Sequence, residues 1–406
     1  MSNRSKRRNK QHKHLTNDLE VYGLPPLHIS NNEDKKKSRG PVQAKAVREH
    51  GDKKYAPILA EALAKTGKSN EATHNFHTYP AGMHPDCARL IIEACPGSVH
   101  DPFCGGGTVL VEAKRLGRRA TGTDISPIAQ LVAKARCAGP EMATPLRSAA
   151  RKIAEKAKLR VEVEIPEELQ EWYQPHVAQE LGRIRDEIVK MDENIQPLLR
   201  AVFSSILIKA SYRKSDTSNH KQKHHRPPGT TAYLFHKKAR ELGRMLETMP
   251  DEPKSQIIHG NACDTPPPHP VDLVLTSPPY PGVYDYLPLQ QIRLTWMDLT
   301  KQTPFKLELG SRRNFRAKGR KNALTEWQTN TAQWISTQSN ALNSGGSMVI
   351  VVGDGIIGGK LVDALYPTVE AMKACGLRIV ARASADRPDH ARKAIRIEHL
   401  VMGIKE

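Results

Sequence analysis

The chain has 406 residues, enough for one large domain with insertions or for two domains. It carries 62 Lys and Arg against 43 Asp and Glu, a formal net charge of +19, which favours nucleic acid as the partner because each neutralised phosphate releases a counterion. There is no run of about eighteen or more apolar residues, so we expect no membrane span. The six cysteines show no C-x-x-C pair and no spacing typical of metal ligands, so we expect free thiols and no metal site.

Residues 1–70 are rich in Lys, Arg, His and Asn, with "RSKRRNKQHKH" near the start. A segment this polar buries too little apolar surface to offset its ordering entropy, so we predict a largely disordered basic tail. An arm for nucleic acid, a nuclear address and a solubilising tail all remain open as its role. Because no apolar signal-peptide core is present, we expect a cytoplasmic location in the bacterial nucleoid, with a nucleus or organelle as the alternative.

One strand–helix–strand unit is predicted in the next part of the chain. A helix over 85–95 precedes a short strand around "SVHDPF" and then Gly105-Gly106-Gly107-Thr108. The stretch "VLVEAKRLG" has apolar residues at helical spacing and stops at a glycine, and "RATGTDI" follows as a second strand. This order is typical of a βαβ unit.

A long helix-favouring insert, 142–250, separates this unit from the following strands and is a candidate target-recognition region. It contains a basic, His-rich loop at 212–231 without cysteine partners for a zinc ion. Strands are predicted in "SQIIHGNACD", "PVDLVLTSPPY", "GGSMVIVVGDGII", "LRIVARAS" and "IRIEHLVMGIK", with a helix in "LVDALYPTVEAMKACG". We therefore predict an α/β catalytic domain over 71–141 and 251–406, with a mostly parallel sheet and a terminal antiparallel hairpin.

The turn "DPFCGGGT" follows a strand and opens a helix. Its glycines let the backbone approach a ligand, and the helix N-terminus offers free N–H groups. Asp124 ends the next strand, where a ribose is held through its hydroxyls in nucleotide-binding folds. Asp101 would repel a pyrophosphate and suits a ligand with an ammonium group, such as the amino-acid part of S-adenosylmethionine (AdoMet). An ordinary glycine-rich turn is the alternative.

The stretch "LVLTSPPYPGVYDYL" ends a buried strand in Ser277-Pro278-Pro279-Tyr280. The two prolines fix φ and remove two N–H donors, so the Ser277 hydroxyl and the Pro278 carbonyl are held at the carboxyl edge of the sheet, where ligands bind. Two acceptors at one point suit the exocyclic NH2 group of a planar base, and the Tyr280 ring can stack on that base. The alternative is a proline-stiffened strand end that packs a tyrosine.

Together the two motifs resemble those of the AdoMet-dependent amino-methyltransferases of DNA, over most of residues 74–406. The resemblance implies a Rossmann-like AdoMet-dependent methyltransferase fold, S-adenosyl-L-methionine as cofactor and DNA as partner. The cofactor-binding residues that it implies are Tyr79, Pro80, Asp101, Phe103, Gly105, Gly107, Thr108, Asp124, Ile125 and Asp264. The catalytic residues that it implies are Ser277, Pro278, Pro279 and Tyr280.

The family resemblance also implies the reaction, which is direct methyl transfer to an exocyclic amine of a base flipped out of the duplex. The residue Ser277 is commoner among the cytosine-N4 enzymes of the family, so we expect that base, with adenine N6 as the alternative. Tyr284 and Asp285 are candidates for the base pocket, or Asp285 caps a turn. A second basic loop, 311–322, is a candidate backbone clamp or a solvated surface.

Three other functions remain open from the sequence. They are methylation of a guanine amine in RNA, methylation of a protein glutamine amide, and nucleic-acid binding without catalysis. A site-specific DNA methyltransferase would also predict a restriction endonuclease partner encoded elsewhere.

Overall fold

The computed structural model describes residues 47–67, 69–80, 82–159, 161–216, 218–223, 225–357, 360–389 and 394–406. They divide into two compact units. The central unit comprises Lys68–Thr276 and Tyr286–Glu308. The terminal unit comprises the chain up to Gly67, Ser277–Asp285 and Leu309–Glu406.

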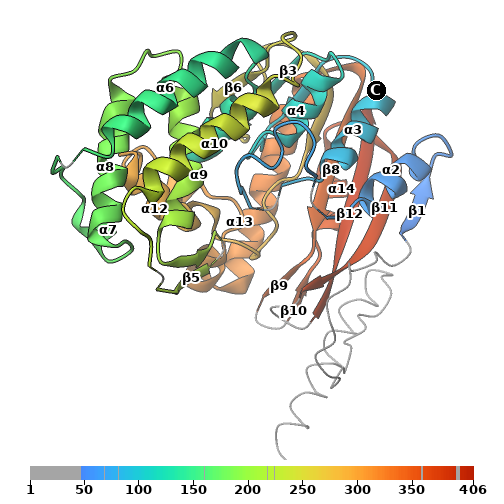
Figure 1. Ribbon diagram of the computed structural model, residues 1–406. Helices are drawn as coiled ribbons and strands as arrows, with labels where there is room; N and C mark the ends of the chain where they lie inside the picture. The colour runs from blue at the N-terminus through green and yellow to red at the C-terminus, as the bar shows by residue number, and fades with distance from the viewer. Residues whose placement is uncertain are drawn as a thin grey trace, which may run out of the picture. The chain divides into compact units, whose positions relative to one another are not determined.

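Four strands of the central unit are parallel and lie in the order β7-β2-β3-β6. Their bounds are β2 Val99–Asp101, β3 Ala120–Asp124, β6 Gln256–His259 and β7 Val271–Thr276. The helices beside them are α3 Pro85–Ala94, α4 Thr108–Arg115 and α5 Pro127–Cys137 (Figure 1). This confirms the predicted βαβ unit, β2–α4–β3.

The helices start where the sequence offers capping groups. Ser126 accepts a hydrogen bond from the backbone N–H of Ala129, and Pro127 occupies the first turn of α5. The ring of His84 accepts from the N–H of Asp86 at the start of α3. A side-chain acceptor at this position satisfies one of the otherwise unpaired N–H groups of the first turn.

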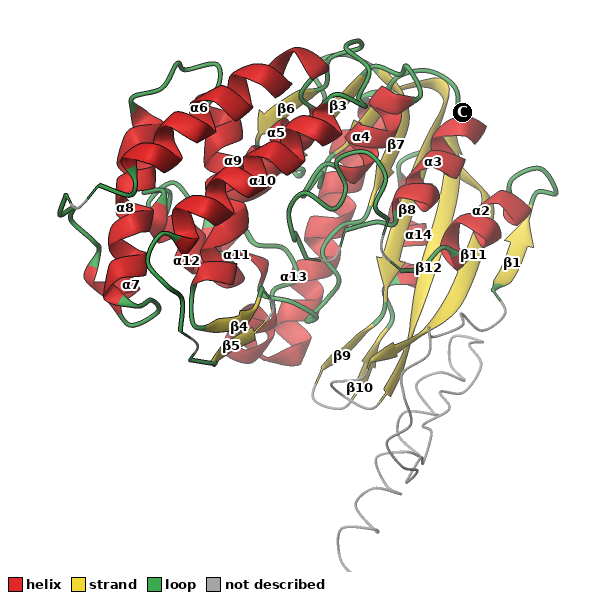
Figure 2. Cartoon of the chain, viewed as in Figure 1, coloured by secondary structure: helices red, strands yellow, loops and turns green. Residues whose placement is uncertain are grey.

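Residues 140–249 of the central unit are mostly helical (Figure 2). The elements are η1 Pro140–Met142, α6 Ala143–Lys156, α7 Glu167–Gln170, α8 Pro175–Val189, α9 Gln196–Ala210, β4 Arg213–Ser215, β5 Ser218–Lys221 and α10 Thr230–Leu246. Three short elements, α11 Tyr286–Leu289, α12 Gln291–Trp296 and η2 Phe305–Leu307, complete the unit.

One apolar core joins this helical part to α5, a helix that lies beside the parallel strands. It contains buried side chains of α5, α6, α8, α9, α10 and α12. Trp296 lies within it, with the rings of Tyr173 and Phe203 edge-on at centroid distances of 5.7 and 5.9 Å. Helix α9 is buried over most of its circumference, which explains its nearly continuous apolar sequence.

The strands of the terminal unit are antiparallel and lie in the order β1-β11-β12-β8. Their bounds are β1 Arg48–Gly51, β8 Leu342–Gly353, β11 Leu377–Asp389 and β12 Ala394–Lys405, with a separate small pair, β9 Gly355–Ile357 and β10 Lys360–Val362. The helices are α2 Ala56–Ala64, α13 Arg312–Asn340 and α14 Leu365–Ala374. The predicted terminal hairpin and the α/β class are thus confirmed.

Two basic segments differ from the sequence expectation. Most of the predicted disordered tail, 1–46, lies outside the described residues, but 48–64 contains β1 and α2. Strand β1 has no apolar pattern and forms because its backbone pairs with β11. The segment 311–322, predicted as a loop, begins α13, with Ser311 accepting from the N–H of Asn314 and a break at Gly319, where φ is +73°.

Within the part of the chain that the structure describes, no helix is both long and apolar enough to span a bilayer.

Candidate functional site

The glycine-rich turn of the central unit lies between β2 and α4. Gly105 has a φ of +49° and Gly107 a φ of +81°, a region that side chains disfavour. A Cβ atom on Gly107 would also lie 3.0 Å from the Cβ of Ala133 in α5. The turn is therefore closed to larger residues at Gly107 by both backbone conformation and packing. Thr108 is the first residue of α4 and is half-buried.

Asp124 ends β3 and holds the glycine-rich turn. One carboxylate oxygen accepts from the backbone N–H of Gly105 at 2.9 Å, and the other accepts from the N–H of Ser126 at 2.8 Å. Its side chain and that of the following Ile125 are half-buried. Each oxygen keeps a lone pair for a ligand, so this carboxylate is oriented by the backbone before any ligand arrives.

Asp101 ends the neighbouring strand β2 and is only 4% exposed. One of its oxygens, Oδ1, accepts from the hydroxyl of Thr276 at 2.7 Å and from the backbone N–H of Phe103 at 3.1 Å. Thr276 is the last residue of β7, so two adjacent parallel strands are joined at their carboxyl ends by this bond. The sequence indicated Asp101 but not its partner.

Neither carboxylate forms an ion pair with a Lys or Arg among the described residues. Burial raises the pKa of Asp101 to about 7, with hydrogen bonds from Thr276 and Phe103 acting in the opposite direction. Burial likewise raises the pKa of Asp124 to about 6, against the hydrogen bonds from Ser126 and Gly105. Two buried carboxylates without a bonded cation are hydrogen-bond acceptors suited to an ammonium group and to hydroxyl groups.

The contribution of Asp101 to the stability of the ligand-free protein is expected to fall as the pH rises from about 4 through 7. A carboxyl group whose folded pKa is raised binds its proton more tightly in the folded state, so its stabilising contribution is full below the unfolded pKa and is lost as the pH passes the folded pKa. For Asp101 the loss between pH 5 and 7.5 is about 2–3 kcal/mol.

Denaturant unfolding of the wild type and of Asp101→Asn at both pH values measures this loss. The amide keeps an acceptor for Thr276 and Phe103 but does not titrate, so the pH dependence of the variant should be smaller by that amount. Equal pH dependence in the two proteins would contradict the assignment.

Residues 73–80 pack against the glycine-rich turn through a buried arginine. The guanidinium of Arg136, in α5, donates to the carbonyl of Gly106 at 2.9 Å, to that of His74 at 2.8 Å and to that of His77 at 2.6 Å. The Arg136 carbonyl accepts from the Thr73 hydroxyl at 2.8 Å. Arg136 thereby holds this segment to the turn.

Tyr79 lies over the turn as a result. A Cβ atom on Gly105 or Gly106 would lie 3.4 or 3.2 Å from Tyr79 side-chain atoms. Burial, and then the charge of Asp124, raise the pKa of Tyr79 well above its usual value. Pro80 is buried beside it and Phe103 is half-buried.

Asp264 lies in the turn after β6, and β6 pairs with β3 in parallel, so both strands end at the same edge. Its carboxylate is exposed and accepts from the hydroxyl of Thr265 at 2.9 Å. The structure therefore places Asp264 in the turn that follows the strand paired with β3, and it shows no bond between the described atoms of Asp264 and the other predicted cofactor residues.

The Ser277-Pro278-Pro279-Tyr280 segment belongs to the terminal unit. The hydroxyl of Ser277 donates to that of Tyr280 at 3.4 Å, and Tyr280 donates to the carboxylate of Glu398 in β12 at 3.0 Å. The Ser277–Tyr280 contact is long for a bond between hydroxyls, and a serine oxygen carries two lone pairs that can accept hydrogen bonds.

The surroundings of Tyr280 restrict its ring. A Cβ atom on Gly353 would lie 2.5 Å from the ring, so the ring rests on the backbone of β8. Arg387 donates to the other oxygen of Glu398 at 2.8 Å and so fixes the acceptor of the Tyr280 hydroxyl. Sequence reasoning found no signal for Glu398 or Arg387, which lie more than a hundred residues away.

Asp285 in the terminal unit accepts from the backbone N–H of Arg313 at 2.9 Å and lies 3.8 Å from its guanidinium. This bonding agrees with the alternative in which Asp285 caps a turn, here the first turn of α13. The neighbouring Tyr284 is half-buried, and its carbonyl accepts from the N–H of Arg312 at 3.3 Å.

No protein-family model matches the chain. It is 40% identical over 74 residues to the type II methyltransferase M.MvaI of Kocuria varians, a match that covers 17% of this chain and 16% of that protein. It is 30% identical over 91 residues to the type II methyltransferase M.BsoBI of Geobacillus stearothermophilus, covering 20% of this chain and 18% of that one. The matches thus span less than a fifth of the length of either relative.

Among solved structures, TrmN from Thermus thermophilus matches 80% of this chain and 50% of its own length, at a TM-score of 0.30 and 10% identity. The rRNA methyltransferase AviRa from Streptomyces viridochromogenes matches 85% of this chain and 96% of its own, at a TM-score of 0.34 and 13% identity.

Proposed function

We propose that the protein is an AdoMet-dependent methyltransferase that methylates the exocyclic amine of a base in DNA, with cytosine N4 as the favoured position. The observation that carries the proposal is the hydrogen bond of 2.7 Å from Thr276 to Asp101. Ser277 follows Thr276 directly in the sequence, so the two candidate motifs meet at consecutive residues. The partial similarity to two type II methyltransferases supports the same reaction class.

Two carboxylates of the central unit suit the polar groups of AdoMet. The carboxylate of Asp124 suits the two ribose hydroxyls, and the buried carboxylate of Asp101 suits the ammonium group of the methionine part. The positive φ of Gly105 and Gly107 lets the turn fold tightly between β2 and α4, with the Gly105 N–H bonded to Asp124. Tyr79, Pro80, Phe103, Thr108, Ile125 and Asp264 are the other residues proposed to bind the cofactor.

The protein's part in the reaction is to orient the amine. Bound AdoMet supplies an electrophilic methyl group on a sulfonium. The Ser277 oxygen and the Pro278 carbonyl accept hydrogen bonds from the two N–H groups of the target amine. These bonds draw the lone pair of the nitrogen out of conjugation with the ring. Ser277 is proposed to act as an acceptor, with its hydroxyl proton turned toward Tyr280, which Glu398 holds by a hydrogen bond of 3.0 Å. No covalent enzyme intermediate is required: the N–C bond would form as the S–C bond breaks, which leaves the cofactor as the neutral thioether, and the methylated nitrogen would release one proton to solvent.

Arg136 is proposed as a positioning residue for cofactor binding. Replacing Arg136 with Lys leaves at least one of the carbonyls of Gly106, His74 and His77 without its donor, since an ammonium cannot reproduce the planar fork. We expect the AdoMet Kd to rise about tenfold and the free energy of unfolding to fall by about 1–3 kcal/mol.

Isothermal titration with AdoMet and denaturant unfolding measure these two effects, and Arg151→Lys on the exposed side of α6 is the matched control. A variant that is destabilised but binds AdoMet as the wild type does would reduce Arg136 to a purely structural role.

Transfer of labelled methyl groups tests the proposed function. The protein is incubated with labelled AdoMet and, in separate reactions, with duplex DNA, total RNA or protein, and the digested product is identified. Label in N4-methylcytosine is expected. Label in N6-methyladenine would correct only the base, whereas label confined to RNA or protein, or no transfer at all, would overturn the proposed substrate.

A further inference from the structure

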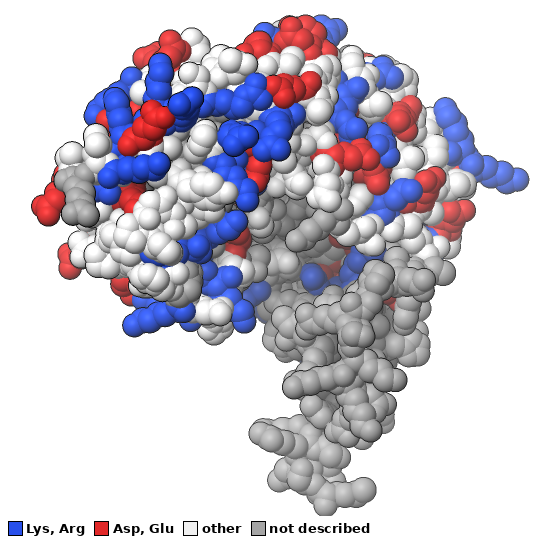
Figure 3. Space-filling model, in the orientation of Figure 1, with Lys and Arg blue, Asp and Glu red and all other residues white. Residues whose placement is uncertain are grey.

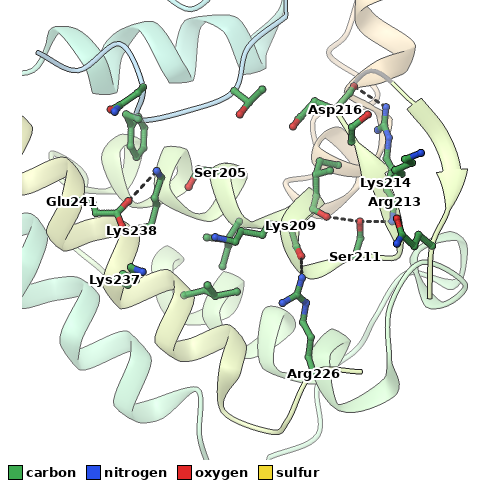
Figure 4. Close-up of a pocket in the computed structure, with 18 residues that line it drawn as sticks. Ser205, Lys209, Ser211, Arg213, Lys214, Asp216, Arg226, Lys237, Lys238 and Glu241 are labelled. Carbon is green, nitrogen blue, oxygen red and sulfur yellow. Dashed lines mark hydrogen bonds and ion pairs between the residues drawn. The ribbon is translucent and has the colours of Figure 1, made fainter. Parts of the chain in front are cut away.

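A hollow in the central unit lies apart from the carboxylates described above. It has a volume of about 640 Å³ and is enclosed by α9, β4, α10 and residues 75–78 (Figure 4). This size lies within the range of ordinary ligand pockets. Six basic residues line it: Lys209, Arg213, Lys214, Arg226, Lys237 and Lys238. Only two acidic residues do so, Asp216 and Glu241.

Both acidic residues already have basic partners. Asp216 pairs with the guanidinium of Arg293, whose side chain is 1% exposed. Glu241 pairs with Lys238 at 3.1 Å along α10. The carboxylates therefore neutralise little of the charge that the other basic side chains bring to the hollow.

Three of the lysines remain without an ion pair within the described residues. Lys209 on α9, Lys214 in β4 and Lys237 on α10 are all exposed and come from three different elements. They line one hollow from different sides, and a concave site lined by like charges concentrates their field on an anion. On the face seen in Figure 3, further Lys and Arg side chains lie over α6 and α10.

The walls of the hollow are held by hydrogen bonds. The guanidinium of Arg226 donates to the carbonyl of Lys209, and that of Arg213 donates to the carbonyls of Leu289, at 2.7 Å, and Asp216, at 3.0 Å. The hydroxyl of Ser211 donates to Ile208 at 2.8 Å and accepts from the N–H of Arg213 at 3.0 Å. The cationic groups thus sit on a fixed frame, which lowers the entropy lost when an anion binds.

The hollow and the candidate cofactor residues share one short segment. Phe76 and Thr78 line the hollow, and the next residue, Tyr79, lies against the glycine-rich turn. The ammonium and guanidinium donors suit phosphate oxygens. We propose that this hollow binds backbone phosphates of the DNA substrate. The inference rests on the proposed function, and it names a phosphate-binding site for that substrate.

Equilibrium binding of a DNA duplex at 50–200 mM salt tests the site. The test variant carries Lys209→Gln, Lys214→Gln and Lys237→Gln. The matched control carries Lys152→Gln, Lys158→Gln and Lys254→Gln, which remove the same charge from the same unit outside the hollow.

We expect the test variant to bind DNA at least about tenfold more weakly, with a salt slope reduced by about 2–3, since each lost phosphate contact reduces the slope by about 0.9. The control variant should change the slope by less than about 1. AdoMet affinity should be unchanged in both. An equal loss in the two variants, or no loss in either, would overturn the site.

Binding of inorganic phosphate and binding of RNA are measured as well, to separate a DNA site from a small-anion site and from an RNA site. If inorganic phosphate binds the wild type but not the test variant, while both bind DNA alike, the hollow is a small-anion site and the proposal fails. If the variant loses affinity for RNA but not for DNA, the DNA assignment is wrong.

Methyl transfer by the wild type tests the proposed function independently of the phosphate-binding site. Transfer to DNA with normal binding by the test variant would defeat only the site. Weakened DNA binding by the variant, with no transfer by the wild type, would defeat only the function.

Discussion

Replacing Ser277 with alanine is expected to lower kcat for methyl transfer about 100- to 1,000-fold, with the AdoMet Kd changed less than about threefold. Ser277 is proposed to accept a hydrogen bond from an N–H group of the target amine as that nitrogen becomes nucleophilic. The Ser277 hydroxyl donates a hydrogen bond to Tyr280, and the hydroxyl of Tyr280 donates to Glu398 at 3.0 Å. The acceptor is therefore oriented before the base arrives, and its loss acts mainly on the transition state.

Single-turnover transfer and titration with AdoMet separate the two effects of Ser277→Ala. Ser344→Ala, at an exposed position of β8, is the matched control and should behave as the wild type. Tyr280→Phe should give a smaller loss, about tenfold, because Ser277 keeps its oxygen but loses the partner that holds its proton. A parallel loss of AdoMet affinity and turnover in Ser277→Ala would contradict the assigned role.

The second large effect is expected in Asp124→Ala, with the opposite pattern. The AdoMet Kd should rise about 100-fold or more, while kcat at saturating AdoMet falls less than about tenfold. The carboxylate accepts from the N–H groups of Gly105 and Ser126 and is proposed to accept the ribose hydroxyls as well. Each charge-assisted hydrogen bond contributes about 1.5–3 kcal/mol, so losing two is enough for this change.

A change of fold must be separated from a change of binding in this variant. Asp124→Asn keeps one acceptor and should give an intermediate Kd, with a free energy of unfolding lower by about 1–3 kcal/mol because one of the N–H groups of Gly105 and Ser126 loses its acceptor. Asp264→Ala, which removes an exposed carboxylate, should change the Kd less than about tenfold. If Asp124→Ala binds AdoMet normally but transfers methyl groups slowly, the Asp124 carboxylate has another role than the one proposed.

Local sequence was sufficient for the elements around the site. The glycines of "DPFCGGGT" require a tight strand–helix turn, and the structure has positive φ at Gly105 and Gly107. The alternation of strands and helices predicted β2, α4, β3, β6 and β7, because hydrophobic period and turn residues act over a few positions. The adjacent prolines after β7 similarly restrict their own backbone and that of Ser277.

Long-range pairing was not visible in the sequence. Strand β1 exists because its polar residues pair with β11, more than three hundred residues away. The bonds of Arg136 to three carbonyls join segments that no periodicity connects.

The sequence by itself thus determined the α/β class, the glycine-rich turn and the proline-bounded strand end, since each depends on backbone restrictions of neighbouring residues. Only the tertiary structure decided which groups meet. It joined Thr276 to Asp101, Tyr280 to Glu398, and three lysines from separate elements around one hollow. Such contacts depend on how distant segments pack, and burial then sets the charge state of the groups brought together.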